Sequence, residues 1–181
     1  MTSKRALLVG IESVPVGGGI ASGTGSGSGS EGGSGALSVP LEGTANDIKL
    51  FQRLLPLYGF QDSNVLTLLN EAATREAILG HLKGLVEQTG PSDVALFAFF
   101  GHGDQMPNEQ KPNGYTETIV PYDARLKPNV RMDIRDDEIL AILEKANSNN
   151  ITLIFDCCHA ADITRDIPFK KHPTFKVCPD C

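Results

Sequence analysis

The pattern of apolar and polar residues divides the chain into short apolar runs and longer amphipathic segments. A continuous apolar run of strand length is typical of a β-strand that is covered on both faces of its sheet. Four such runs predict strands at residues 6–11, 65–69, 94–100 and 151–155. Between them, three segments carry apolar residues at helical spacing. Their expected inward residues are Ile48, Phe51, Leu54 and Leu55, then Ile78, Leu79, Leu82, Leu85 and Val86, and then Ile139, Leu140, Leu143 and Ala146.

Polar residues and glycines mark where the predicted helices begin and end. Thr44 and Thr74 each precede an amphipathic segment, so each is expected to cap the amino terminus of a helix. Gly59 is expected to end the first helix and Gly90 the second, whereas Asp136 opens the third. The alternation of strands and helices predicts an α/β domain with a mostly parallel sheet and helices on both faces.

Two segments lack any periodicity. Residues 17–35 are almost entirely Gly and Ser and have too little apolar surface to offset their ordering entropy, which predicts a flexible loop at about 13–40. Residues 104–131 form a polar connection rich in Pro, Asn and Gly, of a length that is typical of functional or disordered segments. A chain of 181 residues is expected to form a single domain, with an irregular tail from about residue 162.

Charge and cysteine content narrow the class of protein. The formal net charge of −6 disfavours binding to a phosphate backbone, so nucleic acid is not an expected partner. No apolar run approaches the roughly 20 residues that span a bilayer, and the first residues lack a signal-peptide pattern, so we expect a cytoplasmic protein without a membrane partner. The four cysteines do not resemble a secreted disulfide framework, which leaves catalysis or metal binding in a reducing compartment.

Candidate chemistry follows two of the predicted strands. Gly101-His102-Gly103 comes after the strand at 94–100, and Cys157-Cys158 comes soon after the strand at 151–155. Ligands of open α/β sheets bind at the carboxyl ends of strands, so the imidazole and a thiol are expected on neighbouring strand ends. A nucleophilic thiol needs a nearby base, and His102 could serve Cys158 in that role.

The neighbouring groups fit an acyl-transfer site. The backbone N–H groups of Gly103 and Cys158 are candidates for stabilising an oxyanion. Side chains alternate along a strand, so Cys157 is expected in the core when Cys158 faces the site. The alternative is that Cys158 is a buried core thiol and His102 an ordinary turn residue.

The order of these motifs is similar to that of a known family. An apolar strand, Gly-His-Gly, a long polar loop, Asp-Asp-Glu, a second apolar strand and Asp-Cys-Cys-His resemble the caspase-haemoglobinase clan, and within it the metacaspases and related fungal caspase-like proteins. The resemblance extends from Arg5 to about Ala160 and implies a three-layer αβα caspase-like fold. It also implies a cysteine endopeptidase that uses a His102–Cys158 dyad and cleaves after Arg or Lys. The Gln-Ala-Cys signature of caspases is absent.

The resemblance also suggests how a basic substrate side chain is held. Gly43, Asn46 and Asp47 match a family pattern that follows the first strand, so Asp47 is one candidate and Asp156 the other. Paired carboxylates suit a guanidinium because they bind it in bidentate fashion. The alternative for Asp47 is the third position of a capping box behind Thr44. Phe100 stands where metacaspases usually have Ser, which implies a more apolar pocket.

Many metacaspases need calcium, which aspartates on this surface bind. Asp136 and Asp137 match one part of that site, but Thr116 stands where an aspartate is usual. Only Asp162 or Asp166 could supply the carboxylate that follows the dyad. Calcium takes six to eight oxygen ligands, so we expect weak calcium binding or none, and no other cofactor. The alternative for Asp136-Asp137 is a helix start that complements the macrodipole.

Two other motifs are compositional. Gly27, Gly29 and Gly32 satisfy a dinucleotide fingerprint only within the Gly/Ser tract, and Cys178 and Cys181 have the spacing of half a zinc site without a second pair.

The expected partners follow from the family. They are a polypeptide substrate and either a small-subunit segment or a second copy, because the sequence resembles a large-subunit half that lacks the small-subunit strands. The competing hypothesis is a caspase-like scaffold or pseudo-protease that binds a partner through the sheet edge at the last strand.

Overall fold

The computed structural model describes residues 2–16, 40–111, 114–127, 130–158 and 176–177. Its main sheet has five parallel strands in the order β2-β1-β3-β7-β8. The strands are β1 (Lys4–Gly10), β2 (Val65–Leu69), β3 (Val94–Phe100), β7 (Ile151–Asp156) and β8 (Lys176–Val177). The α/β prediction is therefore confirmed. The edge of β7, which the sequence suggested would lack a neighbour, pairs with β8 at Ile154 and Phe155.

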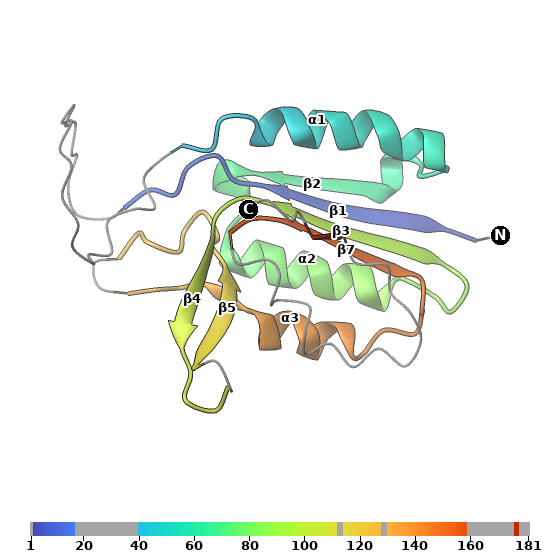
Figure 1. Cartoon of the computed structure of the whole chain (residues 1–181). Helices are drawn as coiled ribbons and strands as arrows, with labels where there is room; N and C mark the ends of the chain where they lie inside the picture. The colour runs from blue at the N-terminus through green and yellow to red at the C-terminus, as the bar shows by residue number, and fades with distance from the viewer. Residues whose placement is uncertain (1, 17–39, 112–113, 128–129, 159–175, 178–181) are drawn as a thin grey trace.

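Helices cover both faces of this sheet, which gives three layers (Figure 1). The α-helices are α1 (Thr44–Leu54), α2 (Arg75–Glu87) and α3 (Asp136–Leu143), and the short 3-10 helices are η2 (Leu55–Tyr58), η3 (Asp62–Asn64) and η4 (Asn70–Ala72). Helix α1 lies over one face, whereas α2 and α3 lie over the other.

Side-chain alternation along the strands fills two separate cores. Leu7, Phe97 and Phe155 face α2 and α3, and Leu8 and Ala98 face α1, as the period of two requires. All five of these residues are almost completely buried. The continuous apolar runs of β1 and β3 thus reflect strands that are buried on both faces, whereas Leu66 and Leu69 of the edge strand β2 are exposed.

The predicted starts of α2 and α3 are confirmed, whereas α2 ends at Glu87, before the predicted Gly90. Thr74 caps α2, because its Oγ1 accepts a hydrogen bond from the Ala77 N–H at 3.2 Å. Gly59, at a left-handed φ of 80°, ends the 3-10 turn that follows α1. The predicted cap at Thr44 is wrong, because Gly43 is the N-cap and Thr44 is the buried first residue of the helix.

The close approach of α1 to β1 explains the buried position of Thr44. A Cβ atom added to Gly10 would lie 2.8 Å from Ile48 Cγ1 and 3.1 Å from Thr44 Cγ2. The methyl group of Thr44 therefore packs against the end of β1. Tertiary packing has overridden the local capping preference of this threonine.

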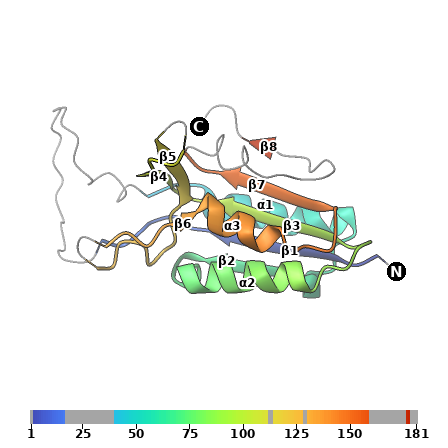
Figure 2. The same cartoon turned by 90° about the horizontal axis from the view of Figure 1, so that it is seen from below.

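The polar connection after β3 contains a second, unpredicted sheet. Strands β4 (Gly103–Pro107), β5 (Tyr115–Ile119) and β6 (Ile134–Arg135) form an antiparallel sheet in the order β4-β5-β6. This sheet stands beside the carboxyl ends of the main strands (Figure 2). Strand β5 buries polar residues, among them Glu117, so the sequence has no apolar run that would predict a strand there.

The Asp93 carboxylate connects the start of β1 to the turn before β3 through hydrogen bonds. Asp93 accepts hydrogen bonds from the Ser3 N–H at 2.6 Å and from the Gly90 N–H at 3.1 Å. The Arg5 guanidinium lies 3.4 Å away. The pKa of Asp93 lies below its usual value, because its carboxylate accepts the hydrogen bond from Ser3 and, with a smaller effect, the one from Gly90. The positive charge of Arg5 lowers this pKa more weakly, whereas burial raises it.

Several predicted features lie outside the described residues: the Gly/Ser loop at 17–35, the predicted tail from 162 apart from residues 176–177, the glycines of the dinucleotide fingerprint, and Cys178 and Cys181. Residues 176–177 of the predicted irregular tail form strand β8. The two ends of the loop segment are in contact, since the Leu41 N–H donates to the Glu12 carbonyl at 2.7 Å. No helix in the described part of the chain is long and apolar enough to cross a membrane.

Candidate active site

The carboxyl ends of β1, β3 and β7 meet at one edge of the main sheet. Phe100 at the end of β3 is in register with Asp156 at the end of β7. Beyond the ladder, the Gly101 N–H donates to the Asp156 carbonyl at 3.2 Å, and the Ile11 N–H donates to the Phe100 carbonyl at 2.9 Å. The two segments that carry the predicted chemistry therefore leave the sheet side by side.

His102 links the main sheet to the antiparallel sheet. It lies between β3 and β4, and its carbonyl accepts a hydrogen bond from the Val120 N–H, just after β5, at 3.0 Å. Its side chain is half-buried. Both sheets thus fix the backbone of the predicted base.

Gly103 brings the histidine and cysteine segments into direct contact. A Cβ atom at this position would lie 1.9 Å from the Cys158 carbonyl oxygen and 3.3 Å from Cys157 Sγ. No side chain fits there, so the glycine of the Gly-His-Gly motif is required by the close approach of the two backbones.

The adjacent cysteines lie in different environments. Cys157 is 4% exposed and belongs to the core beneath α2 and α3, whereas Cys158 is exposed. The prediction that Cys157 is a core residue is confirmed. The alternative in which Cys158 is the buried core thiol is wrong, and its role as nucleophile stays a prediction.

The two predicted specificity carboxylates lie at the same edge of the sheet. Asp47 is in the first turn of α1, which begins beside Gly10 at the end of β1. Asp156 is the exposed last residue of β7, and the alternation that directs Ile154 toward the α1 core also directs Asp156 to the α1 face. Figure 1 shows the start of α1 at this end of the sheet.

The capping-box alternative for Asp47 is wrong. The N-cap residue Gly43 has no side chain, and α1 has no side-chain cap hydrogen bond. Within the described part of the chain, the half-buried Asp47 carboxylate has no hydrogen bond or ion pair. It is therefore available to a basic ligand.

Phe100 belongs to the core beneath α1. Its ring is 4% exposed and makes an edge-on contact with Phe51, with 5.1 Å between the ring centroids. The expectation that Phe100 makes the pocket more apolar is therefore wrong, because the ring does not line the surface of the site.

A charged cluster beside His102 escaped prediction from the sequence. Asp133 is fully buried and accepts two hydrogen bonds from the Arg125 guanidinium and one, at 2.9 Å, from Arg131. Both arginines also contact Asp104. This cluster joins β4, two residues after His102, to the segment that leads into β6. The chain offers no local signal for it, because its members are spread along a polar connection.

The described residues do not fit calcium. Asp136 is 6% exposed in its side chain and forms an ion pair with Lys111, whose Nζ lies 3.1 Å from Oδ2. The Thr116 hydroxyl accepts a hydrogen bond from Asn108 at 2.7 Å. Among the residues that the structure describes, no group of three or more His, Cys, Asp or Glu could hold a metal ion.

The remaining calcium candidates, Asp162 and Asp166, lie outside the described residues. The alternative interpretation of Asp136-Asp137 as a helix start is confirmed, because α3 begins at Asp136 with three acidic residues in its first turn.

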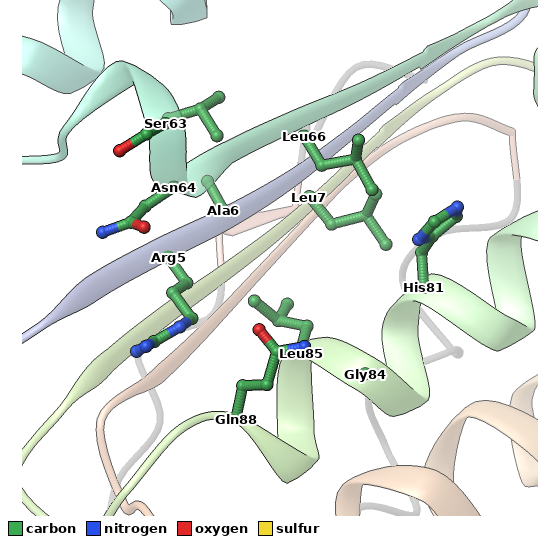
Figure 3. Close-up of a pocket in the computed structure, with 11 residues that line it drawn as sticks. Arg5, Ala6, Leu7, Ser63, Asn64, Leu66, His81, Gly84, Leu85 and Gln88 are labelled. Atoms are coloured by element: carbon green, nitrogen blue, oxygen red, sulfur yellow. The ribbon is translucent and has the colours of Figure 1, made fainter.

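A surface cavity lies at the opposite end of the strands. Figure 3 shows it between the starts of β1 and β2 and one side of α2, with Leu7, Leu66 and His81 among its lining residues. None of the predicted site residues lines it. The candidate site is therefore the carboxyl edge of the sheet, not this cavity.

Comparison with known proteins decides the family. The family model described as metacaspase, peptidase C14 domain, matches residues 4–168. This chain belongs to the metacaspase family. It is 31% identical over 140 residues to Metacaspase-5 of Trypanosoma cruzi, which covers 71% of this chain and 30% of that protein. It is 30% identical over 140 residues to Metacaspase-1 of Schizosaccharomyces pombe, with 71% and 32% covered.

This metacaspase chain spans about a third of the length of these curated relatives. Its structure is similar to the crystal structure of a protein from Geobacter sulfurreducens, with a TM-score of 0.64 and 22% identity over 87% of this chain and 51% of that one. That likeness concerns the fold alone and agrees with the predicted caspase-like architecture. The predicted family resemblance is confirmed.

Proposed function

We propose that this metacaspase chain carries the catalytic dyad of a cysteine endopeptidase that cleaves polypeptides after Arg or Lys. Cys158 is the nucleophile and His102 the general base. One observation carries the proposal: Gly103 packs against the Cys158 backbone, so the histidine and cysteine motifs meet at the carboxyl edge of the sheet. Family membership supports the same assignment.

The proposed chemistry uses the groups at this edge. His102 takes the proton of the Cys158 thiol, and the sulfur attacks the scissile carbonyl carbon to form a C–S bond. The N–H groups of Gly103 and Cys158 are proposed to stabilise the oxyanion. His102 then gives its proton to the leaving amine as the C–N bond breaks. Water hydrolyses the thioester, which releases the acid product and restores the thiol.

Basic specificity rests on Asp47 and Asp156. Both lie on the α1 side of the site, and the Asp47 carboxylate has no partner within the described residues. A guanidinium or ammonium group would gain a charged hydrogen bond there, whereas an acidic substrate side chain would be repelled by the negative charge of the carboxylates.

The test is covalent labelling with an electrophilic peptide that ends in Arg. We expect mass spectrometry to locate the label on Cys158, with labelling lost in Cys158→Ala and strongly slowed in His102→Gln. The matched control is Cys157→Ala, which removes the adjacent buried sulfur and should still be labelled, because alternation directs that thiol into the core.

Each other outcome rejects part of the proposal. A label on Cys157 would show that the wrong sulfur has been assigned. A folded chain that no probe labels would favour a caspase-like scaffold that acts through partner binding. Faster labelling by a peptide that ends in Asp would exclude the basic pocket at Asp47 and Asp156.

A further inference from the structure

An ion pair joins the connection between β4 and β5 to helix α3. Lys111 lies in the connection between β4 and β5, and Asp136 is the first residue of α3. The Lys111 ammonium is 3.1 Å from Asp136 Oδ2, and the two side chains are 23% and 6% exposed. An ion pair with this little exposure is screened much less than a surface pair.

Several other oxygens around this pair accept hydrogen bonds from the protein. Asp136 Oδ1 accepts the Asp137 N–H at 2.7 Å, and Asp137 Oδ1 accepts the Arg135 Nε–H at 2.9 Å. The hydroxyl of the buried Thr116 accepts a hydrogen bond from Asn108. Protein donors therefore already occupy both oxygens of Asp136, one oxygen of Asp137 and the hydroxyl of Thr116.

A divalent cation would be unfavourable in this network. Calcium takes six to eight oxygen ligands, whereas Lys111 and Arg135 supply positive charge and no acceptor. An incoming ion would have to displace the ammonium from Asp136 or lie beside it and be repelled.

We infer that the Lys111 ammonium is a built-in cation that occupies the place of a divalent ion at the start of α3, so that this junction is assembled without calcium. The inference concerns the folded structure and stands whether or not the chain is a peptidase. It corrects what the family resemblance alone would imply for the carboxylates of Asp136 and Asp137.

The test is calcium binding and thermal unfolding of the purified chain. With calcium chloride or with a calcium chelator, the wild type should unfold at the same temperature and show no saturable heat in a calcium titration. Lys111→Gln should lower the unfolding temperature by several degrees, and calcium should restore part of that loss, since the Asp136 carboxylate is then accessible to it.

A matched control distinguishes loss of the Lys111–Asp136 pair from loss of an exposed lysine. Lys83→Gln removes an exposed lysine from a pair with Glu87 in which both side chains are 62% exposed, and it should leave the unfolding temperature almost unchanged. Saturable calcium binding to the wild type, or a Lys111→Gln variant as stable as Lys83→Gln, would overturn the inference.

A second variant covers the case in which Lys111→Gln does not fold. The double variant Lys111→Gln/Asp136→Asn replaces the ion pair with two neutral amides and avoids an unpaired buried charge. It should fold and show no calcium response. If calcium raised the unfolding temperature of this double variant and of the wild type by the same amount, the calcium site would lie elsewhere and the inference would be overturned.

Discussion

Asp133 should be among the most sensitive charged positions in the described structure. Its side chain is fully buried and accepts hydrogen bonds from Arg125, which is 13% exposed, and from Arg131. Asp133→Asn keeps the shape and removes the charge, which leaves the Arg125 guanidinium buried with only the partly exposed Asp104 as a counter-charge. Breaking a buried ion pair in this way costs about 3–5 kcal/mol.

This cost is large enough for a clear measurement. For a chain of this size, each kcal/mol lowers the unfolding temperature by about 2–4 °C, so Asp133→Asn should lower it by about 6–20 °C. Urea unfolding should show a lower midpoint with an unchanged slope, since the folded core is retained. The control Glu87→Gln removes one partner of the exposed pair with Lys83 and should change stability by about 0.5 kcal/mol or less.

A double-mutant cycle separates the ion pair from simple loss of packing. Asp133→Asn and Arg125→Gln should be strongly non-additive, because the double variant no longer contains an unpaired buried charge. If Asp133→Asn is as stable as Glu87→Gln, or if the two effects add, then the cluster does not stabilise the junction between β4 and β6 as the structure indicates.

Three further predictions follow from single contacts. Gly103→Ala should displace the Cys158 segment and abolish labelling by the arginine probe, and normal labelling of this variant would refute the contact. The control is Gly80→Ala, at a helical glycine with nothing within 4 Å of the new Cβ, which should stabilise the fold by about 0.5–1 kcal/mol. Because the pKa of Asp93 is lowered in the folded chain, its carboxylate stabilises the fold fully above its ordinary pKa of about 4, and this stabilisation is lost as pH falls through the folded value. The difference in unfolding free energy between the wild type and Asp93→Asn should therefore shrink in acid, and a difference in urea titrations that stays constant with pH would contradict this. Replacing residues 17–39 with a short glycine linker should change stability by about 1 kcal/mol or less, because halving a loop gains only about 0.6 kcal/mol and its two ends already meet; a fall of many degrees in thermal unfolding would show that the segment packs on the fold.

The parts of the fold that depend on local pattern could be predicted from the sequence. Strands 65–69 and 94–100 have the predicted bounds, because each is a largely apolar run with clear polar or glycine ends. Strand β5 could not be predicted, because it buries the polar residues Thr116, Glu117 and Thr118, whose side chains contact partners on other segments. One such partner is the side chain of Gln105.

The candidate site likewise has parts that could be predicted from the sequence and parts that could not. The motifs around His102 and Cys158 follow strands that the pattern identifies, so their meeting at one edge follows from parallel topology. The Lys111–Asp136 pair joins residues from two separate segments, and the Asp133 cluster connects Asp104 to Arg125, Arg131 and Asp133 further along the chain; neither set has a shared motif. Thr44 illustrates the limit, because its local capping signal is strong and its contact with β1 overrides it.

The period of two in β7 assigns different roles to consecutive residues at the site. Phe155 and Cys157 face the core beneath α2 and α3, while Asp156 between them faces the α1 side, where Asp47 lies in the first turn of α1. One strand end therefore supplies a core anchor and a candidate specificity carboxylate before the chain reaches Cys158. A one-residue change in register would exchange these faces, burying a carboxylate and exposing a phenyl ring. The apolar anchor at Phe155 and the close packing of Gly103 on the next turn thus fix which of the two thiols is presented at the edge of the sheet.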